Sequence, residues 1–193
     1  KQDLEIFLNK VPDQVAVAQK FFAETIKSLG NEYGQQPSML EAICVEIGHS
    51  LGSVIAQTRA VSGLALSNSK QAHPCVSFES PGSLDIWKKT FEHSDYEKAI
   101  AYAKDNFHTI QSGLPNIIST CHEQVCPKVY SAAVVFDFSK LLFLPKKIST
   151  KKWDLQYLEY SLLAHGVYPI YQQLKKKKSV QLSEWPKNQE DGF

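Results

Sequence analysis

The chain has 193 residues, of which 43% are hydrophobic and 21% charged, and its formal net charge at pH 7 is +1. These values are typical of a globular protein that is long enough to bury a core, and the near-neutral charge gives no reason to expect a nucleic-acid partner. No run approaches the ~18 uninterrupted apolar residues of a membrane-spanning helix, and no signal peptide is visible, which favours a cytoplasmic protein.

The first predicted element is a helix that follows Asp13. Apolar side chains recur at helical spacing over residues 15–29, Asp13 suits the N-cap, and Gly30 stands where a C-terminal cap belongs. A loop is expected at 31–38. The alternation of apolar and polar residues at 42–47 then predicts the first strand.

The remaining elements continue the alternation of helix and strand. They are, in chain order, a helix at 51–62, a strand at 75–80, mostly helix at 84–111, a short strand at 116–120, a longer strand at 129–138 and a helical segment at 153–174. This order predicts an α/β fold with a parallel or mixed sheet covered on both faces. We expect one domain over residues 1–175, followed by a polar, mobile tail at 176–193.

The four cysteines are too few to form a disulfide framework in a chain of this length. We expect buried thiols, with a bridge between Cys44 and Cys75 on neighbouring strands as the alternative. Cys121, His122 and Cys126 are close in sequence, but they lack the second ligand pair of a structural zinc site. We therefore expect no metal ion.

The most informative stretch is Gly-His-Ser-Leu-Gly at residues 48–52, between the first strand and the next helix. A strand, then Gly-x-Ser-x-Gly, then a helix is the pattern of the nucleophile elbow, in which strained backbone angles expose a serine hydroxyl. Ser50 is the predicted nucleophile, and Gly48 and Gly52 provide the small side chains that this turn needs. The helix that begins at Leu51 directs its N-terminal amides at the same point. A turn that merely requires glycines is the alternative.

A nucleophilic serine needs a base, and the histidines available are His49, His73, His93, His108, His122 and His165. The setting of His165 is the most suitable. A helical pattern ends at Ala164, and Pro169 fits the first turn of another helix, so His165 should lie on a loop before the final helix. His49 lies inside the elbow and should point away from the serine hydroxyl. A surface histidine at a helix break is the other interpretation of His165.

The segments "GHSLGSVIAQ" and "VSFESPGS" resemble the class 3 lipases, the fungal-lipase-like α/β hydrolases, and the resemblance covers about residues 3–173. "LLAHGVYPI" is similar to the late histidine-containing segment of that family. "NIISTCHEQVCPKVY" is similar to the segment that carries its catalytic aspartate. The resemblance implies an α/β-hydrolase-like three-layer sandwich, with a mostly parallel sheet and helices on both faces.

The resemblance places Glu123 where the family has its aspartate. Asp137, at the end of the next predicted strand, is the rival, and a chain without a working acid is the third interpretation. The order of Ser50, acid and His165 matches that of the hydrolases. The Leu51 amide would donate one hydrogen bond to the oxyanion. The family's second donor lies on an earlier strand, so this chain is either part of a larger enzyme or a repurposed hydrolase.

We therefore expect a serine ester hydrolase of the lipase type that uses no metal or organic cofactor and forms an acyl-enzyme on Ser50 with carboxylic esters of lipids. The alternative is a non-catalytic interaction domain that keeps the elbow as scaffold. The aromatic segment at 84–111 fits either a lid over an acyl-binding pocket or a helix packed on the sheet. The four lysines at 175–178 fit either contact with an anionic membrane surface or a solvated helix end.

Overall fold

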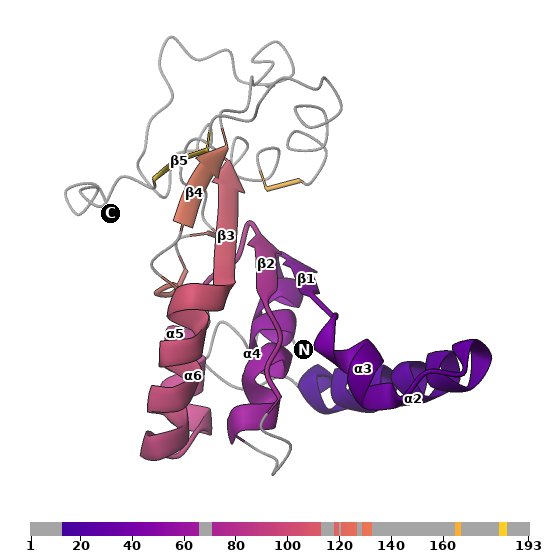
Figure 1. Cartoon of the computed structure of the whole chain (residues 1–193). Helices are drawn as coiled ribbons and strands as arrows, with labels where there is room; N and C mark the ends of the chain where they lie inside the picture. Colours follow the sequence, from indigo (N-terminus) through magenta and orange to yellow (C-terminus); the bar gives the residue numbers. More distant parts are fainter. Residues whose placement is uncertain are drawn as a thin grey trace, which may run out of the picture.

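The computed structural model of the chain describes residues 13–65, 71–112, 118–119, 121–126, 129–132, 165–166 and 182–184. These residues form a mixed α/β structure around one sheet (Figure 1). The strands are β1 (Glu46–His49), β2 (Cys75–Phe78), β3 (Phe107–Ser112), β4 (Val129–Ala132) and β5 (Leu182–Glu184). They lie side by side in chain order. The first four are parallel and β5 is antiparallel to β4.

The helices contribute most of the buried hydrophobic side chains of the described core. They are α2 (Gln14–Tyr33), α3 (Pro37–Ala42), α4 (Leu51–Ala65), α5 (Leu84–Thr90) and α6 (His93–Asn106). Helix α4 packs along β1 and β2 and also contacts α6. Figure 1 shows α4, α5 and α6 gathered beside the sheet, whereas α2 and α3 project beyond β1. None of the described helices combines the length and apolar composition needed to cross a membrane.

The predicted parallel pairing of the strands near 42–47 and 75–80 is confirmed. Ile47 of β1 lies opposite Val76 of β2, and the last pair in the register is His49 with Phe78. Both strands therefore end at the same edge of the sheet, and Ser50 follows directly. The carboxyl edge of a parallel sheet is where α/β proteins commonly place their functional groups.

The solvent exposure of the apolar side chains at and before β1 differs from the prediction. The alternation of Ile43, Val45 and Ile47 is real, but the strand begins only at Glu46, and the three apolar side chains are 77%, 51% and 70% exposed. Among the described residues, no helix covers this face of β1, so the expected helical layer on the second face is not observed there. The residues of β1 meet α4 with the opposite side of the strand, where Gly48 is buried.

Helix α2 also departs from the prediction, since it packs mainly on α3 and α4 rather than on the sheet. It continues past Gly30 to Tyr33, and Gly34, with a φ of 63°, is the residue that ends it. Only a residue without Cβ adopts this left-handed backbone at low cost, which makes Gly34 the better terminator. Asp13 precedes the helix but makes no side-chain cap hydrogen bond.

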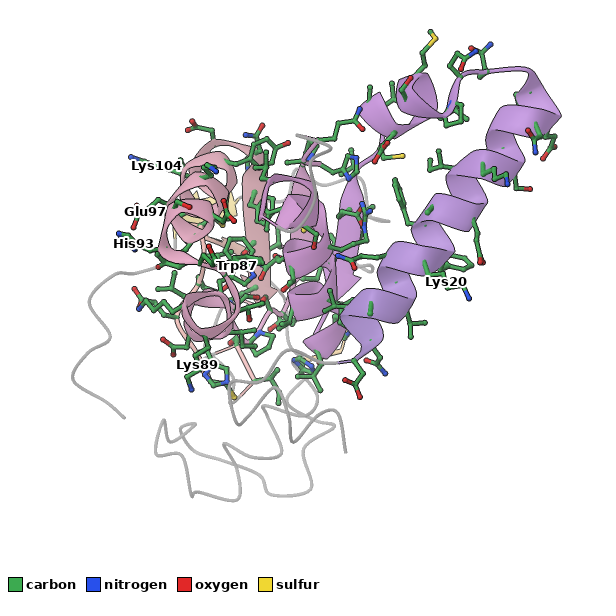
Figure 2. All side chains as sticks on the ribbon, turned by 90° about the horizontal axis from the view of Figure 1, so that it is seen from below. Lys20, Trp87, Lys89, His93, Glu97 and Lys104 are labelled. Atoms are coloured by element: carbon green, nitrogen blue, oxygen red, sulfur yellow. The ribbon has the colours of Figure 1, made fainter. Side chains whose placement is uncertain are left out.

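The segment at 84–111 is a packed helical pair followed by a strand that the sequence analysis missed. Trp87 of α5 is completely buried, and its indole N–H donates to the Thr58 hydroxyl of α4 at 3.1 Å. Figure 2 shows Trp87 directed inward, while His93, Glu97 and Lys104 lie on the outer side of α6. Of the two interpretations of this segment, the packed helix is therefore the one the structure bears out.

Several predicted elements lie outside the described residues. These are the acid candidate Asp137, the helical segment around 153–164, the lysines at 175–178 and most of the predicted tail. One part of that tail is corrected, since Leu182–Glu184 forms strand β5 and pairs with β4. The pairing gives hydrogen-bond partners to the edge of β4, which is the physical reason for a strand to add there.

Candidate functional site

Ser50 adopts the backbone conformation of a nucleophile elbow. Its φ is 56°, it follows the last residue of β1, and α4 begins at the next residue. A left-handed backbone costs an L-residue roughly 1–2 kcal/mol, so such a conformation persists only where the surrounding structure enforces it. Here the Ser50 N–H donates to the Phe78 carbonyl at 2.9 Å, and the N–H of Ser53 donates to the Ser50 carbonyl at 3.0 Å. The two bonds hold the turn from both sides.

The two glycines of the motif have different roles. A Cβ on Gly48 would lie 2.4 Å from the Cα of Ser53 and 2.7 Å from the carbonyl oxygen of Gly52, so only glycine lets α4 approach β1 this closely. A Cβ on Gly52 would meet no atom of the described residues within 4 Å. The prediction that both positions must lack a side chain is therefore right for Gly48 and wrong for Gly52, because the first turn of α4 leaves open space at Gly52.

His165 lies against the predicted nucleophile. Its Nε2 is 2.5 Å from the Ser50 hydroxyl oxygen, so the predicted contact between these two side chains is present. Burial, reinforced by the charge of nearby His49, lowers the pKa of His165 to about 4. The imidazole is therefore neutral at pH 7, and its Nε2 accepts the hydrogen bond that the Ser50 hydroxyl donates. This is the protonation state that a general base requires.

His49 lies closer to the base than the sequence analysis expected. Its Nε2 donates a hydrogen bond to the backbone carbonyl of His165 at 2.8 Å, and the centroids of the two rings are 5.1 Å apart. The expectation that His49 points away from the serine hydroxyl missed this contact because it considered the elbow alone. The ring of His49 connects the turn at Ser50 to His165, over a separation of 116 residues in sequence.

Glu123 does not occupy the acid position. Its side chain is exposed, and its backbone carbonyl accepts from the Leu84 N–H at 3.2 Å. That carbonyl also lies close to Gly82, where a Cβ would come within 2.5 Å of it. The backbone at Glu123 thus faces the protein, which leaves the carboxylate in solvent. Among the described residues, the buried Nδ1 of His165 has no hydrogen-bond partner, so the expected bond from Glu123 is absent.

A different carboxylate was missed by the sequence analysis. Glu79 directly follows β2, its side chain is completely buried, and its φ is 49°. Apart from Ser50, it is the only non-glycine residue with a positive φ in the described part of the chain. The available signal was an acidic residue directly after a strand, two residues before Pro81 of the turn at Pro81-Gly82.

The amide of Leu51, the predicted oxyanion donor, stands at the start of α4. Leu51 is the first residue of α4, and the first amides of a helix have no acceptor within the helix itself. The hydroxyl of Ser53 donates to the Ser50 carbonyl at 2.5 Å, which fixes the first turn of α4 relative to the nucleophile. The Leu51 amide and the positive end of the helix dipole therefore lie beside the Ser50 hydroxyl.

No metal site is seen near these residues. Within the described ranges, no group of three or more His, Cys, Asp or Glu residues could hold a metal ion. Cys44 and Cys75 are not bridged, since the Cys44 thiol donates to the Leu40 carbonyl at 3.2 Å and Cys75 is a buried thiol. Burial raises the pKa of Cys75 to about 12, which makes it unreactive at neutral pH.

The site thus combines a strained serine, a neutral imidazole within hydrogen-bond distance of its hydroxyl, and a helix N-terminus. These are the elements of nucleophilic acyl transfer. Comparisons with protein-family models, with curated proteins and with solved structures found no match to this chain. The function has to be inferred from the geometry around Ser50.

Proposed function

We propose that the chain is a serine ester hydrolase of the lipase type, built on an α/β-hydrolase-like fold and acting on carboxylic esters of lipids. The observation that carries the proposal is the 2.5 Å contact between the Ser50 hydroxyl oxygen and Nε2 of His165, made at a strand–helix turn with a left-handed serine. Without this backbone strain, the contact between Ser50 and His165 would be an ordinary hydrogen bond. The strain is what distinguishes an elbow from a turn.

The proposed reaction follows from this geometry. The Ser50 oxygen attacks the acyl carbon of the ester while Nε2 of His165 takes the hydroxyl proton, and the Leu51 amide donates to the developing oxyanion. His165 then gives the proton to the leaving alcohol, and the acyl group remains on Ser50. Water attacks the acyl-enzyme in the same way and releases the acid. The mechanism requires no metal or organic cofactor.

A fluorophosphonate probe tests the proposal, because it reacts only with serines whose nucleophilicity is raised by a nearby base. We expect labelling of the wild-type protein at Ser50 and none in Ser50→Ala. His165→Ala should lower the labelling rate by several orders of magnitude, since serine and base act as a unit. Short-chain p-nitrophenyl esters should be turned over by the same protein.

A matched control is Ser94→Ala, since Ser94 is exposed on α6 and lies outside the site. This variant should label at the wild-type rate. Labelling that persists in Ser50→Ala, or a folded wild-type protein that does not label, would show that the proposal is wrong.

The second candidate function is a non-catalytic interaction domain. It is favoured by exposed apolar side chains, among them Ile47 on β1, Ile43 at the end of α3 and Phe21 on α2. Large exposed apolar residues of this kind often mark a contact surface. Absence of labelling together with a normally folded chain would favour this candidate.

A further inference from the structure

We propose that Glu79 supplies the carboxylate that orients His165, so that the acid of the site stands at the end of β2, beside the nucleophile. The inference rests on the proposed hydrolase function. Glu79 would be a positioning residue, since it acts on the imidazole and touches neither the ester nor the attacking oxygen. It replaces Glu123, whose carboxylate is exposed.

The position of Glu79 in the sheet supports this assignment. The register of β1 and β2 ends with His49 opposite Phe78, which places Ser50 and Glu79 next to each other at the carboxyl edge. The Ser50 N–H donates to the Phe78 carbonyl, and the Glu79 N–H donates to the Ile110 carbonyl of β3, both at 2.9 Å. Glu79 is therefore held between the nucleophile strand and β3.

The backbone conformation is the second observation. Ser50 and Glu79 have φ values of 56° and 49°, so two neighbouring strands end in the same left-handed conformation. Glycine would adopt this conformation without strain, yet both positions carry a side chain. Strained residues of this kind are concentrated at functional sites. The shared conformation therefore indicates that the side chain of Glu79 matters as much as that of Ser50.

The burial of Glu79 is the third observation. Glu79 is 0% exposed, and it is the only completely buried acidic residue among those the structure describes. A carboxylate is almost never fully buried unless surrounding groups offset its desolvation, and Glu79 does interact with its surroundings. Its burial therefore shows that the side chain is held in place at the carboxyl edge. The other acidic side chains near buried histidines lie elsewhere: Glu46 pairs with Arg59, and Asp85 is 39% exposed.

The group that would meet the Glu79 carboxylate is Nδ1 of His165. Because its Nε2 accepts from Ser50, its Nδ1 carries the proton, and this buried Nδ1 has no hydrogen-bond partner among the described residues. No hydrogen bond joins it to Glu79 in this structure. Catalytic hydrogen bonds are often long in the free enzyme and tighten when the imidazole becomes charged. A carboxylate at Nδ1 would then stabilise the imidazolium that forms as Ser50 attacks.

The decisive comparison is between Glu79→Gln and Glu123→Gln, since both replace a carboxylate with an amide of the same shape. We expect Glu79→Gln to lower kcat for p-nitrophenyl esters and the fluorophosphonate labelling rate by ~10²–10⁴-fold, with little change in KM, because an amide cannot stabilise the charged imidazole. Glu123→Gln should match the wild type. Glu79→Asp, which keeps the charge, should recover part of the loss. A folded Glu79→Gln that labels at the wild-type rate would overturn the proposal.

A measurement on the unaltered protein covers the case in which Glu79→Gln does not fold. NMR of ¹⁵N-labelled histidine reports the titration of His165 directly. Burial beside His49 sets the pKa of His165 at about 4 in the described geometry, in which Nδ1 has no partner. Protonation charges the ring, so a Glu79 carboxylate that reaches Nδ1 at that moment would raise the titrated pKa toward or above its ordinary value of about 6.5. Titration near the ordinary value supports the proposal, and titration near 4 overturns it. The result does not depend on activity, so failure of labelling at Ser50 would reject the hydrolase function separately.

Discussion

Polar side chains gather where β1 meets α4 and again near the start of β1, and the two clusters are built differently. The cluster at the carboxyl edge contains Ser50 and His165, which are neutral at pH 7 and meet at a strained turn. The cluster at the opposite end, here called the basal cluster, consists of Arg59, Glu46, His73 and Phe22. In the basal cluster Arg59 forms an ion pair with Glu46, and its guanidinium lies 3.7 Å from the centroid of the Phe22 ring.

The comparison separates polar groups that stabilise the fold from polar groups that are placed for the proposed reaction. In the basal cluster the cation of Arg59 has an anion, a ring and the Nδ1 of His73 at 2.7 Å as partners, and the described backbone there has no positive φ outside glycine. At the carboxyl edge the backbone of Ser50 is strained, and this is the difference between the two clusters. Unpaired buried nitrogens occur in both, namely Nδ1 of His165 at the edge and Nε of Arg59 and Nε2 of His73 in the basal cluster. We infer that substitutions in the basal cluster act on folding, whereas substitutions at the edge act on chemistry.

The largest effect on stability is expected from Arg59→Ala. It leaves the Glu46 carboxylate buried without its cation, and breaking a buried pair in this way costs about 3–5 kcal/mol. Urea denaturation should show the loss, while the labelling rate of Ser50 per folded molecule should stay at the wild-type value. His165→Ala should show the reverse pattern, with labelling lost and stability changed by about 1 kcal/mol or less.

The matched control for Arg59 is the double substitution Arg59→Met with Glu46→Leu. Replacing both members of a buried ion pair with apolar residues is often neutral for stability, so the double variant should recover most of the loss. If Arg59→Ala unfolds no more easily than the wild type, or if it labels more slowly when folded, the division between the two clusters is wrong.

A second comparison, at the carboxyl edge of the sheet, is between Gly48→Ala and Gly52→Ala. The Cβ added at Gly48 would overlap the backbone of Ser53, at 2.4 Å, so α4 must move away from β1. We expect destabilisation of about 3 kcal/mol, at the upper end of overpacking effects, together with slower labelling because Ser50 moves with α4. The Cβ added in Gly52→Ala meets no atom in the described part of the chain, so this variant should raise stability by about 0.5–1 kcal/mol through helix propensity. Thermal unfolding of both variants measures the difference, and equal melting temperatures would contradict it.

The elbow could be predicted from sequence because its requirements are local. A strand, a glycine two residues before the serine and a helix after it all lie within a few positions of Ser50. The exposure of Ile43 and Ile47 could not be predicted, since alternation identifies a shared face of a strand but not whether another element covers it. Strand β3 was hidden because the helical pattern of α6 continues up to Asn106, directly before Phe107.

The carboxylate proposed to orient His165 could not be predicted from the sequence for a similar reason. Whether a carboxylate after a strand points inward depends on neighbours that are distant in sequence. Glu79 is buried because β3 and the segment at 121–126 pack around the turn that follows it, with the His122 N–H donating to the Pro81 carbonyl at 2.8 Å. Glu123 belongs to that same covering segment, and the packing turns its backbone inward and its side chain outward.

The pH dependence of stability should come in part from the basal cluster. Burial, followed by the charge of Arg59, lowers the pKa of His73 to about 4, although Glu46 and Glu41 lie 3.6 and 3.9 Å from its ring nitrogens. The unfolded chain binds a proton at its ordinary pKa of about 6.5, so between these values the unfolded state holds more protons and stability falls as the pH falls. From pH 7.5 to pH 5 the loss due to His73 should be about 2 kcal/mol.

His73→Asn isolates this contribution, because the amide oxygen takes the place of Nδ1 as acceptor for Arg59 but does not titrate. Urea denaturation of both proteins at pH 7.5 and pH 5 should show a smaller loss in the variant. The contribution of His165, which has the same sign, remains in both proteins and cancels. Equal losses would mean that His73 is not the titrating group of the basal cluster.

We expect the smallest effect on labelling from substitutions of His49, which contacts the His165 segment through one hydrogen bond. The His49 Nε2–H donates to the His165 carbonyl at 2.8 Å and helps to hold His165, the proposed base, beside Ser50. His49→Leu removes this donor, and we expect labelling to slow by roughly tenfold, which corresponds to ~1.4 kcal/mol and is the worth of one hydrogen bond. His49→Gln keeps an amide donor near the position of Nε2 and should label close to the wild-type rate. If the leucine and glutamine variants label equally fast, then the base is held in place by contacts other than His49, and the edge is more rigid than this single bond implies.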